Sequence, residues 1–102
     1  MSVNDTLSER GGRYGPFEQH ARITQELKRV VINHPGYDRL SDDQKEALSM
    51  IFHKVGRIIN GNPNYADSWH DIAGYATLVE QALSSQQQPL TSAGSPDTMD
   101  GQ

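Results

Sequence analysis

The chain has 102 residues, of which 34% are hydrophobic and 22% charged, and its formal net charge is −4 at pH 7. A chain of this length forms one domain at most, and no segment has the roughly 20 consecutive apolar residues of a membrane-spanning helix. The negative charge argues against nonspecific binding to DNA or RNA, because that mode depends on a basic surface that displaces counterions from phosphates. A small anionic ligand needs only a few well-placed cations, so net charge does not exclude one.

The chain contains no cysteine. This excludes a disulfide framework, a zinc ribbon and thiol catalysis, and it fits a reducing compartment. The polar residues 1–12 contain no apolar stretch that could serve as a secretory signal. We therefore expect a cytoplasmic protein that does not contact a membrane.

We predict disordered tails at both ends of the chain. Residues 1–12 are rich in Ser, Asn, Asp, Glu and Gly, and residues 84–102 contain two prolines and almost no large apolar side chains. Segments of such composition bury too little apolar surface to offset the conformational entropy lost on folding. One ordered domain is expected over residues 13–83.

The first predicted helix spans about residues 16–34. Pro16 suits the first position of a helix, and Gly36 ends it two residues after His34. Its apolar residues occupy more than half of the helix circumference, a face that a single partner helix could hardly cover. They are Phe17, Ala21, Ile23, Leu27, Val30 and Val31.

The second predicted helix begins after Ser41 and ends at Gly61. Ser41 and Gln44 have the spacing of a capping box, and a tight apolar stripe follows. The stripe consists of Leu48, Ile51, Phe52, Val55, Ile58 and Ile59.

The third predicted helix is capped by Asn64 and reaches Leu83. The short loop before it favours an antiparallel hairpin with the second helix. Its inner face is expected to consist of Tyr65, Trp69, Ile72, Ala76, Val79 and Leu83.

The predicted fold is all-α, a helical hairpin with the N-terminal helix packed against it. About 70 ordered residues form a core that contributes only roughly 3–5 kcal/mol, so natural proteins of this size often add subunits. The broad apolar face of the first helix points the same way. We therefore expect an oligomer.

The strongest enzymatic pattern is Asp67 and Asp71, one helical turn apart, which could share a Mg²⁺ ion. The all-α nucleoside triphosphate pyrophosphohydrolases of the MazG type use acidic helical motifs in this way, but the second helix here offers Lys54 and Arg57 instead of carboxylates. The simpler interpretation is that both aspartates stabilise the N-terminus of their helix. The sequence contains no Gly-x-Ser-x-Gly motif, the turn that carries the nucleophile of many hydrolases. Its histidines do not have the spacing of a metal site: His20, His34, His53 and His70.

Lys28, Lys54 and Arg57 lack an acidic residue three or four positions away, whereas paired charges usually mark a solvated helix face. Lys28 lies at the edge of the apolar stripe of the first helix, where a partner subunit or a ligand could reach it. A lysine whose stem covers apolar surface while its ammonium stays in water is the simpler alternative.

Tyr14 and Gly15 directly precede the first helix, where free amide groups favour an anion and an aromatic ring can stack on a base. Lys28 is about 20 Å away along the helix axis, too far to share a small ligand with Tyr14 of the same chain. In an antiparallel pair of first helices, Tyr14 of one chain could lie near Lys28 or Arg29 of the other. A tyrosine that merely packs is the alternative.

Gly74 is expected on the outward face of the third helix, beside His70. A glycine inside a helix costs about 1 kcal/mol relative to alanine. Its presence indicates either close approach by a ligand or another backbone, or simple tolerance at an exposed position.

Three segments resemble a known family: residues 14–28 (YGPFEQHARITQELK), 44–48 (QKEAL) and 53–75 (HKVGRIINGNPNYADSWHDIAGY). The chain looks like the small phage proteins that act as cyclic-oligonucleotide sponges against the bacterial CBASS defence. The resemblance covers about residues 14–83. It implies a compact helical hexamer in the cytoplasm of the infected host.

The resemblance further implies sequestration of cyclic GMP–AMP and related cyclic dinucleotides without hydrolysis, with no catalytic residue, metal or cofactor. Tyr14 matches the tyrosine that precedes the family's first helix, and Lys28 or Arg29 matches its basic residue. Cyclic trinucleotides would bind separately, at positions that fall on His70 and Gly74. The family is expected to carry an arginine and a hydroxyl there, so this chain departs from its pattern.

Two other functions remain open at this point. One is the Mg²⁺-dependent pyrophosphohydrolase described above, and the other is an interaction module that blocks a host protein directly. Sequestration of a cyclic dinucleotide is favoured over both. The ligand is nearly symmetric, and its two bases and two phosphates suit a two-fold interface.

Overall fold

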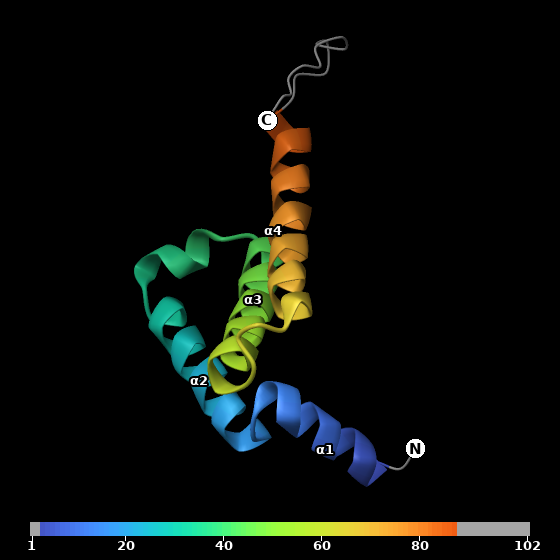
Figure 1. The fold of residues 1–102 in the computed structure, drawn as a ribbon. Coiled ribbons are helices and arrows are strands. Elements are labelled where there is room, and N and C mark those ends of the chain that lie inside the picture. Colours follow the sequence, from blue (N-terminus) through green and yellow to red (C-terminus); the bar gives the residue numbers. More distant parts are fainter. Residues whose placement is uncertain (1–2, 88–102) are drawn as a thin grey trace.

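The computed structural model of the protein describes residues 3–87. These residues form no strand, and their helices follow one another along the chain (Figure 1). The elements are α1 (Val3–Tyr14), α2 (Phe17–Ile32), the short 3-10 helix η1 (Pro35–Arg39), α3 (Asp42–Asn60) and α4 (Ala66–Gln87). The predicted all-α fold class is confirmed. None of the described helices is long and apolar enough to cross a membrane.

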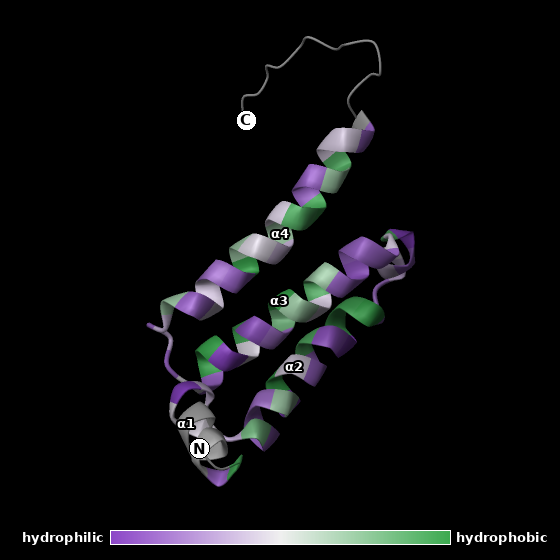
Figure 2. Ribbon diagram, turned by 90° about the vertical axis from the view of Figure 1, so that its right-hand side faces the viewer, coloured by the Kyte–Doolittle hydropathy of each residue, from purple (hydrophilic) through white to green (hydrophobic). Residues whose placement is uncertain are grey.

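Helix α3 is the centre of the molecule. Helix α2 packs along one side of it and α4 along the other, while no comparable contact joins α2 to α4 in the described chain. Figure 2 shows these three helices side by side in one layer, with α3 in the middle. Helices α3 and α4 run in opposite directions, as the predicted hairpin requires (Figure 1). The arrangement is therefore an open layer and not a closed bundle.

The N-terminus of α3 is fixed by the capping box that the sequence predicts. The Ser41 hydroxyl accepts a hydrogen bond from the Gln44 amide at 3.2 Å, and the Gln44 side chain accepts one from the Ser41 amide at 2.9 Å. At the other end the Gly61 amide donates to the carbonyl of Arg57. Both ends of α3 thus follow from local sequence.

The N-terminal segment differs from the prediction, since α1 is helical where a disordered tail was expected. Gly15 ends this helix in the left-handed region, with φ +79°, and its amide donates to the carbonyl of Gly11. A glycine in this conformation just past the last turn is a common helix stop. The Arg13 carbonyl then accepts a 2.6 Å hydrogen bond from the Asn62 amide, which fixes the end of α1 to the loop after α3.

Helix α4 also differs from the prediction at both ends. It begins at Ala66 and not at an Asn64 cap, because the Asn64 amide is held inside the loop by the Asn62 side chain. It extends to Gln87, into the segment expected to be a tail, since no glycine or proline lies between Gly74 and Pro89. The rest of the predicted C-terminal tail, residues 88–102, lies outside the described residues.

The predicted inner face of α4 is only partly correct. Ser68 is buried instead, whereas Trp69 is 55% exposed and donates its indole N–H to the carbonyl of Pro63. Ala76 and Leu83 are exposed too. The small side chain of Ser68 lets the start of α4 approach α3 closely. The larger side chain of Trp69 then remains exposed to solvent.

Very little of the described chain is deeply buried. Ala47 is its one buried hydrophobic residue, while Phe17 and Val30 are 77% and 73% exposed. An apolar groove of about 350 Å³ also opens between α3 and α4, lined in part by Leu48, Ile51 and Val79. The structure therefore has the shortage of core that the sequence predicts.

Candidate functional site

The segment that carries Tyr14 is held rigidly against the end of α3. The Asn60 side-chain amide donates two 2.9 Å hydrogen bonds, one to the carbonyl of Tyr14 and one to that of Pro16. A side chain at Gly15 would collide with the Asn60 carbonyl, and one at Gly61 would collide with the backbone of Arg13 and Tyr14. Two glycines and one asparagine thus fix the backbone of this turn.

A pocket of about 300 Å³ opens beside this turn, between α1, α2 and α3. We call it the Tyr14 pocket. Its lining includes Tyr14, Gly15, Phe17, His20, His53 and Arg57. Sequence positions more than 40 residues apart therefore meet at one hollow.

Two arginines and two tyrosines form a cluster at this pocket. The Arg57 guanidinium carbon lies 4.2 Å from the centre of the Tyr14 ring, a cation–π contact. Tyr65 meets Tyr14 edge to face at 6.2 Å, and Arg13 donates a 2.9 Å hydrogen bond to the Tyr65 hydroxyl. The Tyr14 ring is consequently held between a guanidinium and a second aromatic ring.

Two histidines form the inner wall of the pocket. The His20 and His53 rings meet edge to face with centres 4.4 Å apart, and Nε2 of the buried His20 lies 2.9 Å from the His53 carbonyl oxygen. A carbonyl only accepts, so Nε2 of His20 carries the proton. Burial first, and then the positive charges of His20, Arg57, Lys54 and Lys28, lower the pKa of His53 to about 4. His53 is therefore neutral at pH 7.

The helices approach closely behind this histidine pair. A side chain on Gly56 would lie 2.6 Å from the His20 ring and 2.7 Å from the Thr24 hydroxyl. Both of these α2 residues are buried, and the Thr24 hydroxyl oxygen has no hydrogen-bond partner among the described residues. Gly56 therefore sets the distance between α2 and α3, and with it the width of the Tyr14 pocket.

Lys28 and Arg29 lie further along α2 and do not line the Tyr14 pocket. Lys28 is half-buried and Arg29 is exposed. Lys28 still contributes to the positive field around His53. Within residues 3–87 the two cations therefore remain separate from Tyr14, as the distance estimate from the sequence requires.

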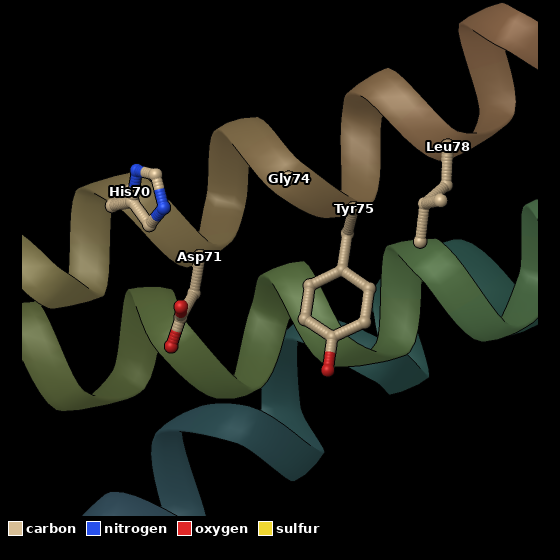
Figure 3. Close-up of a pocket in the computed structure, with 5 residues that line it drawn as sticks. All are labelled: His70, Asp71, Gly74, Tyr75 and Leu78. Carbon is tan, nitrogen blue, oxygen red and sulfur yellow. The ribbon is translucent and has the colours of Figure 1, made fainter.

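His70 and Gly74 line a second, shallower hollow of about 460 Å³ on α4 (Figure 3). Asp71, Tyr75 and Leu78 complete it. Figure 3 shows Asp71 and Tyr75 pointing toward α3. A side chain on Gly74 would meet no atom within 4 Å, so packing inside the described chain does not explain the glycine.

Asp71 forms an ion pair with Lys54, whose nitrogen lies 2.9 Å from the carboxylate. The hydrogen bond from Lys54 is the main reason that the pKa of Asp71 is lowered. Lys54, which has no acidic residue three or four positions away on α3, is thus paired with one on α4. No group of three or more potential metal ligands occurs in the described part of the chain, and the Asp67–Asp71 pattern gains no further carboxylate there.

The family model for DUF6378, described as a domain of unknown function, matches residues 3–83. The chain belongs to the DUF6378 family. No curated protein and no solved structure matches the chain. The match begins at the first residue of α1.

The pocket residues of this DUF6378 domain with a nitrogen-bearing side chain were missed as site residues by the sequence analysis: His20, His53 and Arg57. Arg57 has no acidic residue three or four positions away in the sequence, and this absence could have marked it as a candidate site residue. Its proximity to Tyr14 was not predictable, because it depends on α1 ending against the loop after α3. The histidine pair had no signal, since the two rings come from different helices.

Proposed function

We propose that this protein binds cyclic dinucleotides such as cyclic GMP–AMP and sequesters them without hydrolysis, so that the effector of a CBASS defence is not activated. The observation that carries the proposal is the Tyr14 pocket, where an aromatic ring and a guanidinium without an acidic partner among the described residues occupy one corner. The resemblance of residues 14–83 to phage sponge proteins names the ligand class. The site of action would be the cytoplasm of the infected bacterium.

The chemistry of the pocket suits one half of a cyclic dinucleotide. The ring of Tyr14 offers a stacking surface for a base, which contributes about 1–3 kcal/mol per base. Each charge-assisted hydrogen bond to a phosphate adds about 1.5–3 kcal/mol. Two such half-sites together support submicromolar affinity.

A two-fold pair of chains would provide both half-sites. Tyr14 of one chain would then lie near Lys28 or Arg29 of its partner, matching the near-symmetry of the ligand. The open helix layer supports assembly, because so much apolar surface is left outside it. Apolar residues of α4 also follow the alternating spacing of three and four typical of helix-to-helix packing: Trp69, Ile72, Ala76, Val79 and Leu83. A hexamer is the assembly that the resemblance implies.

The hollow at His70 and Gly74 is the place where a cyclic trinucleotide would bind. It lies on α4, apart from the Tyr14 pocket, so the two ligands would not compete for one site. Of the alternatives, the Mg²⁺-dependent pyrophosphohydrolase has the weaker support, because the carboxylate of Asp71 is paired with Lys54.

Isothermal titration calorimetry with cyclic GMP–AMP tests the proposal, followed by chromatography of the ligand recovered after denaturing the complex. We expect submicromolar binding and an intact cyclic ligand. A linear dinucleotide of the same bases serves as the control and should bind more weakly, because it is less preorganised. Absence of binding, or recovery of a cleaved product, would refute the proposal.

A further inference from the structure

The geometry points to a phosphate-binding site inside the Tyr14 pocket, with the Arg57 guanidinium as its cation. One chain would then supply both the ring that stacks on a base and a group that holds the adjoining phosphate. This inference rests on the proposed function, since it states how that same pocket would hold one half of a cyclic dinucleotide. It adds a contact that does not depend on Lys28 or Arg29 of a partner.

The charge of Arg57 is available for a ligand. Lys54, one helical turn earlier on α3, is paired with Asp71, whereas the Arg57 side chain has no hydrogen bond or ion pair to any described residue. Its contact with Tyr14 leaves the positive charge uncompensated by a carboxylate. A half-buried guanidinium without an acid is unusual, because charged groups removed from water are normally paired.

The position of Arg57 suits a phosphate. Contact with the Tyr14 ring restrains the long side chain, so less conformational entropy is lost when a ligand binds. The N–H groups lie along the edges of the planar guanidinium, and they can donate in pairs to two phosphate oxygens while the Tyr14 contact is kept. The ring and the guanidinium also line the same pocket, so a nucleotide there would contact both.

The surroundings of Arg57 favour an anion. Among the described side chains, no carboxylate lines the Tyr14 pocket, and the titratable groups there besides Arg57 are Tyr14, His20 and His53. Lys28 and Lys54 contribute positive potential at His53 from α2 and α3. The pocket is therefore locally positive on a chain whose formal net charge is −4. Such a local field selects phosphate over a neutral ligand.

The test compares Arg57→Gln with the wild-type protein by calorimetry with cyclic GMP–AMP at low and moderate salt. We expect the affinity to fall by about 10- to 100-fold, the effect of losing one strong charge-assisted contact. The salt dependence should also weaken, because one cation fewer meets the ligand. Arg57→Met provides a second variant that can still pack on Tyr14 without a charge, and it should show the same loss.

Lys45→Gln is the matched control. Lys45 also lies on α3 and also contacts a tyrosine ring, that of Tyr37 at 5.0 Å, but it does not line the Tyr14 pocket. This variant should bind like the wild type. If the wild-type protein binds and either folded Arg57 variant binds within about twofold of it, the inference is wrong and the proposed function stands. If the wild-type protein does not bind, the proposed function itself fails.

Discussion

The Tyr14 pocket and the hollow at His70 and Gly74 are built in opposite ways. The Tyr14 pocket draws residues from three helices, and a double hydrogen bond from Asn60 fixes its backbone. The hollow at His70 and Gly74 lies mainly along one face of α4 and is open where a side chain on Gly74 would point. The first is organised within one chain. The second is lined by residues of α4 alone.

The largest expected effect of a single substitution on ligand binding is that of Tyr14→Ala. A two-fold site would lose both base stacks, so the affinity for cyclic GMP–AMP should fall at least 100-fold. Calorimetry measures this loss. Tyr75→Ala, which removes a tyrosine from the other hollow, should leave the affinity unchanged. Equal losses in the two variants would contradict the assignment to the Tyr14 pocket.

The second largest expected effect is a clear loss of folding stability in Gly15→Ala. Alanine in the left-handed region costs about 1–2 kcal/mol. The added methyl group would also collide with the Asn60 carbonyl. The free energy of unfolding from urea titration should drop by at least that amount. A variant as stable as the wild type would mean that the turn is not held as described.

Gly74→Ala should change the free energy of unfolding in the opposite direction. The methyl group meets open space, and alanine is favoured over glycine inside a helix by about 1 kcal/mol. Urea denaturation should therefore show a stabilised protein. Destabilisation would indicate that another chain approaches α4 closely at this position, which would separate the two explanations for this glycine.

A smaller, pH-dependent effect is expected at His53. Its pKa is lowered from 6.5 to about 4 in the folded chain, so between these values the unfolded chain binds a proton that the folded chain does not. Wild-type stability should consequently fall as the pH drops from 6.5 toward 4. His53→Gln should lose less stability over this range than the wild type. Urea titrations at pH 7 and pH 5 measure the difference.

The smallest expected effect is that of Asp71→Asn. The ion pair with Lys54 is exposed on the carboxylate side, and such pairs contribute little because solvent screens them. Stability should decrease slightly at low salt and match the wild type at high salt. A large loss that persists at high salt would show that this pair matters more than its exposure implies.

The helices with clear local signals were predictable from the sequence. Ser41 and Gln44 mark the start of α3, and Gly61 marks its end. Helix α1 was not predicted, because its composition is polar and its end is fixed by a hydrogen bond from Asn62 in the loop after α3. Propensity alone does not reveal that kind of tertiary support.

The candidate site was predictable only in part. Tyr14 and Gly15 were identified from their place before a helix, and both line the pocket. Arg57 was noted for its missing acid but not placed, since its distance from Tyr14 depends on how α1, α2 and α3 meet. The faces of α4 were misassigned at Trp69 and Ser68, because helical spacing gives the apolar stripe but not the direction from which a neighbouring helix packs.

The most direct test of the central claim is a crystal structure of the protein with cyclic GMP–AMP. The account predicts an intact cyclic ligand, with a base on the Tyr14 ring and a phosphate within hydrogen-bond distance of Arg57. A ligand bound only along α4 at His70 and Gly74, or a hydrolysed ligand in either hollow, would contradict it.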